Sequence, residues 1–267
     1  MLFIKYIRKI FIIGSIIIIS LQLSCEEILK LEVAGDGNII VDTLRWKDNY
    51  NIENIELTDN FKLEIYQSEI PALHVEADSN LMSFIKTDYN RRTLTIRRQS
   101  NYNLSPRKKI IVRLYINNIN NINISNGGIA LCDTFELRKL SVAVLGKSSF
   151  QSNQIVVNEM TCKAESEATI NIDGQFSNLE LTQLGSGVSY LSGNATNLSI
   201  IQEGSGKFEA LEMIASNANI TLNGSGLIYC YVTDFLNVTI RGSGRVYYKG
   251  TPQLYQSIEG EGMIVEY

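Results

Sequence analysis

The sequence predicts an all-β protein whose C-terminal part is a parallel β-helix, or solenoid, capped by an N-terminal β-rich region. Three observations predict this fold: a tripeptide that returns every 18–20 residues, apolar side chains at alternate positions around it, and the loss of this period in the N-terminal part. A fixed period near 20 residues is typical of a solenoid, since each repeat is one coil stacked on the last.

The repeated tripeptide is Gly-Ser-Gly. Toward the N-terminus the same period continues, with single corner residues in place of the full tripeptide. The corners fall at Asn126, Gly146, Ser166, Gly185, Gly204, Gly224, Gly242 and, in an altered copy, Gly260. A tight corner between strands needs a positive φ, which glycine adopts at little cost, and stacked corners bring backbones close together. The alternative is a phosphate cradle built from exposed N–H groups, which needs a strand-to-helix context that the repeat lacks.

Strands are expected on both sides of each corner. Before Gly242, Leu236, Val238 and Ile240 are apolar and the positions between them are polar. Four and six residues after the same corner come Val246 and Tyr248. This period of two predicts strands with one buried face, so each coil reads as strand, corner, strand and return loop. Equivalent strands would stack into parallel sheets with rungs about 4.8 Å apart.

Residues 1–24 are expected to be a signal peptide of the lipoprotein type. Lys5, Arg8 and Lys9 precede an apolar stretch that is short for a membrane span and ends just before Cys25. The small residue before Cys25 resembles a bacterial lipobox, which implies lipid attachment at Cys25, although Gln22 stands where the lipobox usually has leucine. An uncleaved anchor and a non-lipid signal peptide are the alternatives, and all three would export the protein.

The region 26–105 is expected to form the cap and 106–267 the solenoid. A short helix is predicted at Leu81–Lys86, with a capping residue supplied by Asp78-Ser79-Asn80, and a turn at Tyr89-Asn90-Arg91. A cap is needed because an open rung is an unpaired strand edge. Strands are expected at Asn38–Arg45, Ile52–Leu57, Phe61–Gln67, Leu73–Ala77 and Thr93–Arg98.

The net charge and the single histidine favour neither nucleic-acid binding nor catalysis. The net charge is −4, so no nucleic-acid partner is expected, and the basic residues between Arg91 and Lys109 read as solvated strand ends. The single histidine, His74, leaves no zinc pair or triad, so no catalytic residue, metal site or cofactor is predicted. Three cysteines lie at repeat positions that would be too far apart in the stacked coils to form disulfides. They are expected to be buried free thiols: Cys132, Cys162 and Cys230.

The chain resembles the head GIN domain family, named for auto-transporter adhesin heads and found as lipoproteins in Bacteroidetes. The resemblance is carried by Phe61–Gln67, the stretch from Leu73 to Leu81, Thr93–Ile96, the repeated Gly-Ser-Gly and the stretch from Gly242 to Gly250. It implies an all-β fold with a β-helical portion, a location in the cell envelope and no established enzymatic activity. The acidic pair Glu26-Glu27 resembles the surface-export signal of such lipoproteins, so an outer-membrane lipoprotein exposed at the surface is expected.

Outward tyrosines form the candidate ligand-binding face: Tyr190, Tyr229, Tyr231 and Tyr247. Tyrosines on a flat sheet suit an extracellular glycan or protein ligand because they bury area at low entropy cost. Strand propensity alone is the plainer explanation of the same residues.

The predicted function is a non-enzymatic binding or adhesion module of the cell envelope, held to the membrane by a lipid. A carbohydrate-active enzyme on a β-helix scaffold is one alternative, and it would need a cleft with paired carboxylates. A self-assembling structural protein, hence a homo-oligomer, is the other, since solenoid ends can polymerise.

Overall fold

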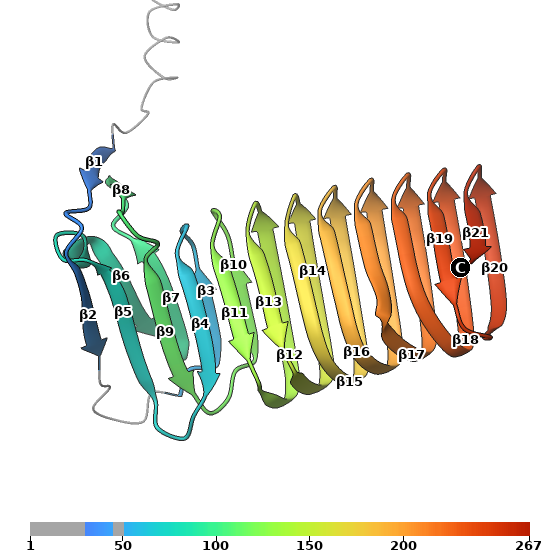
Figure 1. Cartoon of the computed structure of the whole chain (residues 1–267), viewed down its shortest axis with the longest axis horizontal. Coiled ribbons are helices and arrows are strands. Elements are labelled where there is room, and N and C mark those ends of the chain that lie inside the picture. The colour runs from blue at the N-terminus through green and yellow to red at the C-terminus, as the bar shows by residue number, and fades with distance from the viewer. Residues whose placement is uncertain (1–29, 45–50) are drawn as a thin grey trace, which may run out of the picture.

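The computed structural model describes residues 30–44 and 51–267, and most of them lie in β-strands (Figure 1). The predicted signal peptide and Cys25 lie outside the described residues. The N-terminal part contains β1 (Leu31–Ala34), β2 (Ile39–Leu44), β3 (Asn54–Leu57), β4 (Lys62–Gln67), β5 (Ala72–Asp78), the one-turn helix η1 (Met82–Phe84), β6 (Ile85–Asn90), β7 (Thr93–Arg98), β8 (Tyr102–Ser105) and β9 (Ile111–Ile116). The remainder contains β10 (Asn121–Ile124), β11 (Ile129–Asp133), β12 (Glu136–Gly146), β13 (Ser149–Asn153), β14 (Ile155–Ser166), β15 (Thr169–Gly185), β16 (Val188–Gly204), β17 (Lys207–Gly224), β18 (Leu227–Gly242), β19 (Arg245–Lys249), β20 (Gln253–Gly260) and β21 (Met263–Glu266).

The predicted β-solenoid is confirmed, because equivalent strands of successive coils pair in parallel (Figure 1). Strand segments that precede the corners form one face, which we call the first-strand face, and segments that follow the corners form the second-strand face. The first-strand face runs β6-β7-β3-β10-β12-β14-β15-β16-β17-β18-β20. The second-strand face runs β2-β5-β9-β4-β11-β13-β15-β16-β17-β18-β19-β21.

The corners divide into two conformations, which explains where glycine is required. Asn126, Gly146 and Ser166 have φ between 56° and 71°, a left-handed region that asparagine and serine tolerate. The five later corners have φ between 116° and 129°, a region that is essentially confined to glycine. At Gly224 an added Cβ would also lie 2.5 Å from the carbonyl oxygen of Gly204 in the preceding coil.

The second glycine of each tripeptide leaves room for a side chain inside the coil. An added Cβ at Gly226 would lie 2.1 Å from Nε2 of Gln202, and one at Gly244 would lie 2.6 Å from Cδ2 of Leu222. Both of those side chains are completely buried. The Gly-Ser-Gly repeat is therefore a packing requirement of stacked corners.

The return from the second-strand face to the first-strand face is a bent strand in the C-terminal coils, where a loop was expected. β15 and β16 pair in a single register from Ile170↔Ser189 to Gly185↔Gly204. The bend passes through Gly174 and Gly193, and an added Cβ at Gly193 would lie 1.9 Å from the carbonyl oxygen of Gly174. Small residues here let the ladder continue around the turn, so the backbone groups stay paired.

The solenoid extends into the N-terminal region, where the sequence period is lost. β3 and β4 pair in parallel with β10 and β11, with Asn54 opposite Asn121 and Ile65 opposite Cys132. β7 and β9 pair in parallel with β3 and β4 on the other side. The order of coils therefore differs from the order of the chain: the coil built from β7 and β9 lies outside the coil built from β3 and β4.

Antiparallel strands cover the N-terminal end of the stack. β5 pairs with β9 and β2 with β5 on the second-strand face, while β6 pairs with β7 on the first-strand face. The β6-β7 hairpin turns at Arg91 and Arg92, both at positive φ, so it shares only Arg91 with the predicted turn Tyr89-Asn90-Arg91, because β6 continues to Asn90. At the other end of the stack, Ile258 lies two residues before its corner, a position that is buried in earlier coils. It is 41% exposed because β20 pairs with β18 on one side and no described strand covers its other side.

The predicted helix at Leu81–Lys86 is wrong, since only the single turn Met82–Phe84 forms and β6 starts at Ile85. The predicted capping residues are engaged elsewhere. The Asp78 carboxylate accepts hydrogen bonds from the backbone N–H groups of Gly37 (2.7 Å) and Arg107 (3.0 Å). The Asn80 side chain donates to the carbonyl of Ala34 at 2.8 Å. These side chains tie the β1-β2 turn to the cap and leave no N-cap for a longer helix.

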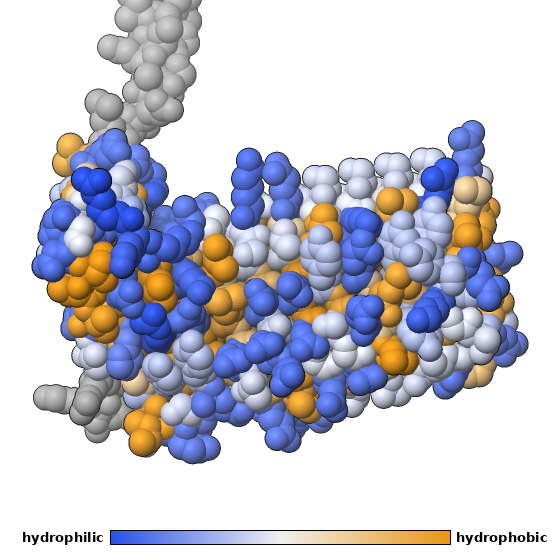
Figure 2. All heavy atoms as spheres, viewed as in Figure 1, coloured by the Kyte–Doolittle hydropathy of each residue, from blue (hydrophilic) through white to orange (hydrophobic). Residues whose placement is uncertain are grey.

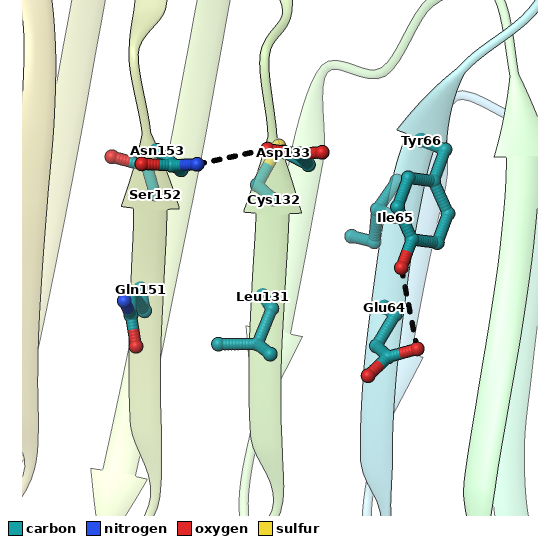
Figure 3. A pocket seen from close by; sticks show the side chains of 9 residues that line it. All are labelled: Glu64, Ile65, Tyr66, Leu131, Cys132, Asp133, Gln151, Ser152 and Asn153. Carbon is teal, nitrogen blue, oxygen red and sulfur yellow. Dashed lines mark hydrogen bonds between the residues drawn. The ribbon is translucent and has the colours of Figure 1, made fainter.

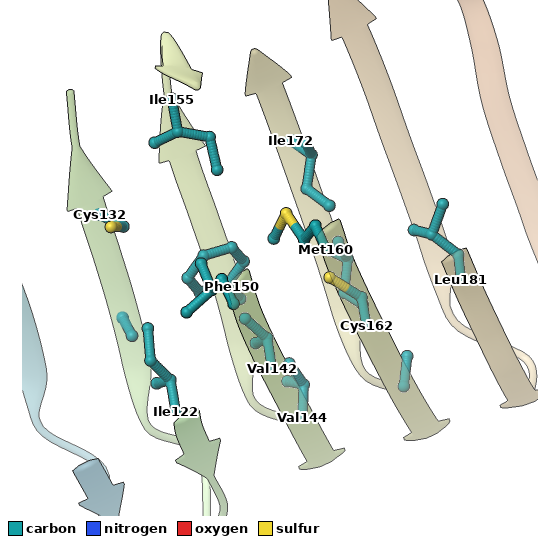
Figure 4. Close-up of a cluster of buried hydrophobic side chains, with 14 of the residues drawn as sticks. Ile122, Cys132, Val142, Val144, Phe150, Ile155, Met160, Cys162, Ile172 and Leu181 are labelled. Carbon is teal, nitrogen blue, oxygen red and sulfur yellow. The ribbon is translucent and has the colours of Figure 1, made fainter. Parts of the chain in front are cut away.

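The core is one continuous column of apolar side chains between the two faces, from Ile52 to Val246. Figure 4 shows part of it, where Phe150, Met160 and Cys162 point into the same interior space. The prediction of buried free thiols is confirmed for Cys132, Cys162 and Cys230. Burial raises the pKa of Cys132 and of Cys230 to about 12 and raises that of Cys162 further. The thiols are therefore neutral and pack as small apolar groups.

Candidate functional site

One uninterrupted line of paired residues crosses the whole second-strand face, and we call it the central row. Each member lies opposite the next across a strand pair, and the side chains point outward. Its members are Thr43, His74, Arg113, Glu64, Leu131, Gln151, Asn171, Tyr190, Glu209, Tyr229, Tyr247 and Val265. Figure 2 shows hydrophilic side chains interspersed with apolar ones along the molecule. The row is a rigid strip because every position is fixed by ladder hydrogen bonds.

The structure brings three of the four candidate tyrosines into the central row. Tyr229 and Tyr247 stack with ring centroids 4.7 Å apart and planes 10° apart. Tyr267 meets both rings edge-on, at 6.0 and 6.5 Å. The ammonium of Lys207 lies 5.0 Å from the centroid of the Tyr229 ring. The faces of these rings are thus largely covered by neighbours, which leaves their edges and hydroxyl groups for a ligand.

Tyr190 is the exposed tyrosine of the row, with 48% of its surface accessible. Glu209 separates it from the Tyr229 stack. A shallow pocket of about 280 Å³ lies beside Tyr190 and is lined also by Asn171, Ser192 and Glu212, among others. The fourth candidate, Tyr231, lies outside the row, two residues along its strand from Tyr229, and its ring is covered by the ammonium of Lys249 at 4.9 Å. Tyr190 is therefore the tyrosine best placed to contact a ligand with its ring.

Charged residues are paired at the N-terminal end of the row. Arg113 donates to Glu64 at 3.0 Å and to Glu76 at 2.8 Å, and Lys62 lies 2.7 Å from Glu64. Burial raises the pKa of the Glu64 carboxyl, but the hydrogen bond and charge of Lys62 with the charge of Arg113 lower it more, so this pKa lies below its usual value. Glu64 is therefore an anion whose charge is compensated by its neighbours.

Two aromatic rings stack beside this charged cluster. Tyr66 and Tyr115 have ring centroids 5.1 Å apart and planes 19° apart. His74 meets Tyr115 edge-on at 5.5 Å, and its Nδ1 lies 3.4 Å from Oγ1 of Thr43. The Tyr66 hydroxyl donates to Glu64 at 3.3 Å. His74 is thus a packed, hydrogen-bonded side chain, as its isolation in the sequence indicated.

A pocket of about 250 Å³, which we call the β11 pocket, opens on the second-strand face between β4, β11 and β13 (Figure 3). Its outward lining side chains are Glu64, Tyr66, Leu131, Asp133, Gln151 and Asn153. Asn153 donates to Asp133 at 3.0 Å. Sequence reasoning missed this site because β4 precedes its neighbour β11 by a 67-residue offset (Cys132 minus Ile65) that the repeat period does not reveal.

The corner N–H groups do not form a phosphate cradle. The N–H groups of Ser205 and Gly206 both donate to the carbonyl of Gly185, at 3.1 and 3.0 Å. The same arrangement recurs one coil earlier, where two corner N–H groups share the carbonyl of Ser166. The donors that a phosphate would need are therefore consumed by stacking.

Metal ligands and membrane spans were sought among residues 30–44 and 51–267. In these ranges no group of three or more His, Cys, Asp or Glu residues is arranged to hold a metal ion. Within the same ranges no helix is long and apolar enough to cross a membrane. Three arginines of the cap pair with carboxylates: Arg92 with Glu53, Arg97 with Asp88, and Arg98 with Asp59.

Comparison with known proteins gives one family match and several structural neighbours. Residues 51–252 match the family described as "putative auto-transporter adhesin, head GIN domain". No curated protein matches the chain. A crystal structure from Parabacteroides distasonis described as a "putative lipid binding protein" has a TM-score of 0.81 at 24% identity and covers 88% of this chain and 99% of its own. A "putative adhesin" from Parabacteroides merdae has a TM-score of 0.79 at 23% identity, with 88% and 99% covered. At these identities the neighbours show the fold.

Proposed function

The chain belongs to the family described as "putative auto-transporter adhesin, head GIN domain", and we propose that it is a non-enzymatic binding module of the cell envelope whose ligand, a glycan or a protein, contacts the central row. The single observation that carries this proposal is the central row itself. A line of outward, mostly polar and aromatic residues that stays in register over the whole face is a long, rigid contact surface. Rigid surfaces with exposed tyrosine bind at low entropy cost.

Binding is favoured over catalysis by the state of the carboxylates. A glycosidase needs a carboxylic acid with a raised pKa to protonate the leaving group. In the β11 pocket the pKa of Glu64 is lowered instead, because Lys62 and Arg113 stabilise its anion. Beside Tyr190, Glu209 is held in an ion pair with Lys207. These carboxylates suit hydrogen-bond acceptance better than proton donation.

A lipid at Cys25 would hold this surface outside the outer membrane. The proposal rests on the apolar leader and the cysteine at its end, together with the adhesin description of the family. The change Cys25→Ala should move the protein from the membrane fraction to the soluble fraction of the producing cells and abolish incorporation of labelled palmitate. Membrane retention with unchanged labelling would show that another residue or the uncleaved leader anchors the protein.

An array of glycans and extracellular-matrix proteins tests the binding function. The protein is compared with a variant in which Tyr190, Tyr229 and Tyr247 are changed to alanine. Specific binding that the variant loses is the expected result. Because Tyr229 and Tyr247 stack, the single change Tyr190→Ala is measured alongside, since it removes an exposed ring and leaves the stack intact. Binding that survives in both variants would remove the tyrosines from the contact surface, and the absence of binding by the unmodified protein would contradict the proposal.

A further inference from the structure

We propose that the β11 pocket binds one sugar ring of a neutral glycan. This inference rests on the proposed function only in taking the second-strand face as the surface that meets a ligand. The pocket lies in the N-terminal half of that face, and its lining contains none of the four candidate tyrosines. Its volume of about 250 Å³ suits a single ring better than a larger organic ligand, since pockets for drug-sized ligands are roughly 300–1,000 Å³.

The pocket exists because the large Tyr66 side chain on β4 has the short Asp133 side chain as its neighbour on β11. The Tyr66 ring is held on the β9 side of β4 by its stack on Tyr115. On the β11 side, the residue that follows the Ile65↔Cys132 pair is Asp133, whose side chain is too short to fill the space beside an aromatic ring. Leu131 forms part of the lining one step along β11. Figure 3 shows Tyr66 and Glu64 on one side of the gap and Leu131 and Asp133 on the other.

The lining combines an aromatic wall with planar hydrogen-bonding groups, which is what a sugar ring requires. A sugar presents C–H groups that pack on an aromatic ring and hydroxyl groups that donate and accept at once. Asn153 donates to Oδ1 of Asp133, which fixes this carboxylate and leaves Oδ2 as an acceptor. Gln151 is exposed and makes no side-chain hydrogen bond to a described residue, so its amide offers both a donor and an acceptor.

Other ligand classes fit the same lining less well. An anion would meet the carboxylates of Glu64 and Asp133. A cation would find Glu64 already compensated by Lys62 and Arg113, at 2.7 and 3.0 Å. An apolar ligand would bury the Asp133 and Gln151 side chains without hydrogen bonds, which costs free energy. A neutral ligand rich in hydroxyl groups satisfies each of these constraints.

The pocket is also aligned with Tyr190. Leu131 and Tyr190 are three steps apart along the central row, through Gln151 and Asn171. Three rungs correspond to about 14 Å. An oligosaccharide anchored in the β11 pocket and laid along the row therefore reaches the exposed tyrosine.

Saturation-transfer NMR with four neutral oligosaccharides tests the pocket: maltohexaose, chitohexaose, laminarihexaose and mannohexaose. Binding of at least one probe is expected, and its affinity should fall tenfold or more in Asp133→Ala. The change Leu131→Trp fills the pocket from a half-exposed position and should abolish binding. The matched control is Asn123→Ala, an exposed residue on β10 of the opposite face, which should leave the affinity unchanged. Thermal unfolding of each variant confirms that it is folded.

The outcomes separate this inference from the proposed function. Failure of all four probes to bind, or binding that is unchanged in both Asp133→Ala and Leu131→Trp, overturns the sugar site. If the array still shows a ligand that depends on Tyr190, the binding function stands without the pocket. If a probe depends on Asp133 and Leu131 while no array ligand depends on Tyr190, the sugar site stands and the tyrosine contact surface is wrong.

Discussion

The substitution Gly224→Ala probes the claim that stacked corners require glycine. Gly224 has φ +126°, and an added Cβ would lie 2.5 Å from the carbonyl oxygen of Gly204, an atom that also accepts a hydrogen bond from Ser225. Placing a side chain at a φ that is essentially confined to glycine costs about 1–3 kcal/mol. Forcing an atom into a filled site costs about 1–3 kcal/mol more. We therefore expect Gly224→Ala to lower the free energy of unfolding by about 2–6 kcal/mol.

The matched control is Gly146→Ala at a corner of the other conformation. Gly146 has φ +71°, and no atom lies within 4 Å of an added Cβ. Only the cost of placing a side chain on a left-handed backbone applies here, so the free energy of unfolding should fall by about 1–2 kcal/mol. Gly146→Asn should cost less, because Asn126 already occupies an equivalent corner at φ 56°.

Equilibrium urea denaturation followed by circular dichroism measures both variants against the unmodified protein. The denaturation slope must be compared too, because long repeat arrays can lose two-state behaviour. A loss in Gly224→Ala no larger than the loss in Gly146→Ala would refute the argument that the preceding coil excludes a side chain at the later corners.

Three further predictions address the interior and the aromatic stack. Gln183→Leu should destabilise by about 1–3 kcal/mol, because the fully buried hydroxyl of Ser189 donates to Gln183 and would be left unpaired. Gln202→Leu should cost less, because the Gln202 Oε1 atom has no partner and the carbonyl of Gly206, to which Gln202 Nε2 donates, also accepts the N–H of Leu227; equal losses in urea denaturation would contradict this. A double-mutant cycle between Tyr229 and Tyr247 should give a coupling of about 0.5–1.5 kcal/mol, and zero coupling would show that the stack adds nothing beyond burial. Raised pKa values and burial should keep three thiols unreactive toward a disulfide reagent at mildly alkaline pH until the protein unfolds, so fast labelling of the native protein would contradict the packing of Cys132, Cys162 and Cys230.

The repeat region could be predicted from the sequence because its information is local. All eight corners from Asn126 to Gly260 have positive φ. The alternation before each corner places Leu236, Val238 and Ile240 in the core. Each residue and its stacked neighbour are separated by one short period. Tyr190, Tyr229 and Tyr247 each lie five residues after a corner, so their position on one face could be predicted from this offset.

The N-terminal part could not be predicted in the same way, because its partners are far apart in the chain. The pairing of β4 with β11 depends on a long insertion that folds outward as the cap and a further coil. The β11 pocket, which this pairing creates, has no sequence signature of its own. Capping propensity misled the helix prediction because Asp78 and Asn80 bind the β1-β2 turn instead. The position of the Lys207 ammonium over the Tyr229 ring also has no sequence signature.

The most direct test of the central claim is the affinity of the strongest array ligand for two single-tyrosine variants. Tyr190 on the second-strand face and Tyr255 on β20 of the first-strand face are similarly exposed, at 48% and 53%. Biolayer interferometry should show binding weakened tenfold or more by Tyr190→Ala and unchanged by Tyr255→Ala. Unchanged binding by Tyr190→Ala, or a loss confined to Tyr255→Ala, would contradict the central row as the contact surface.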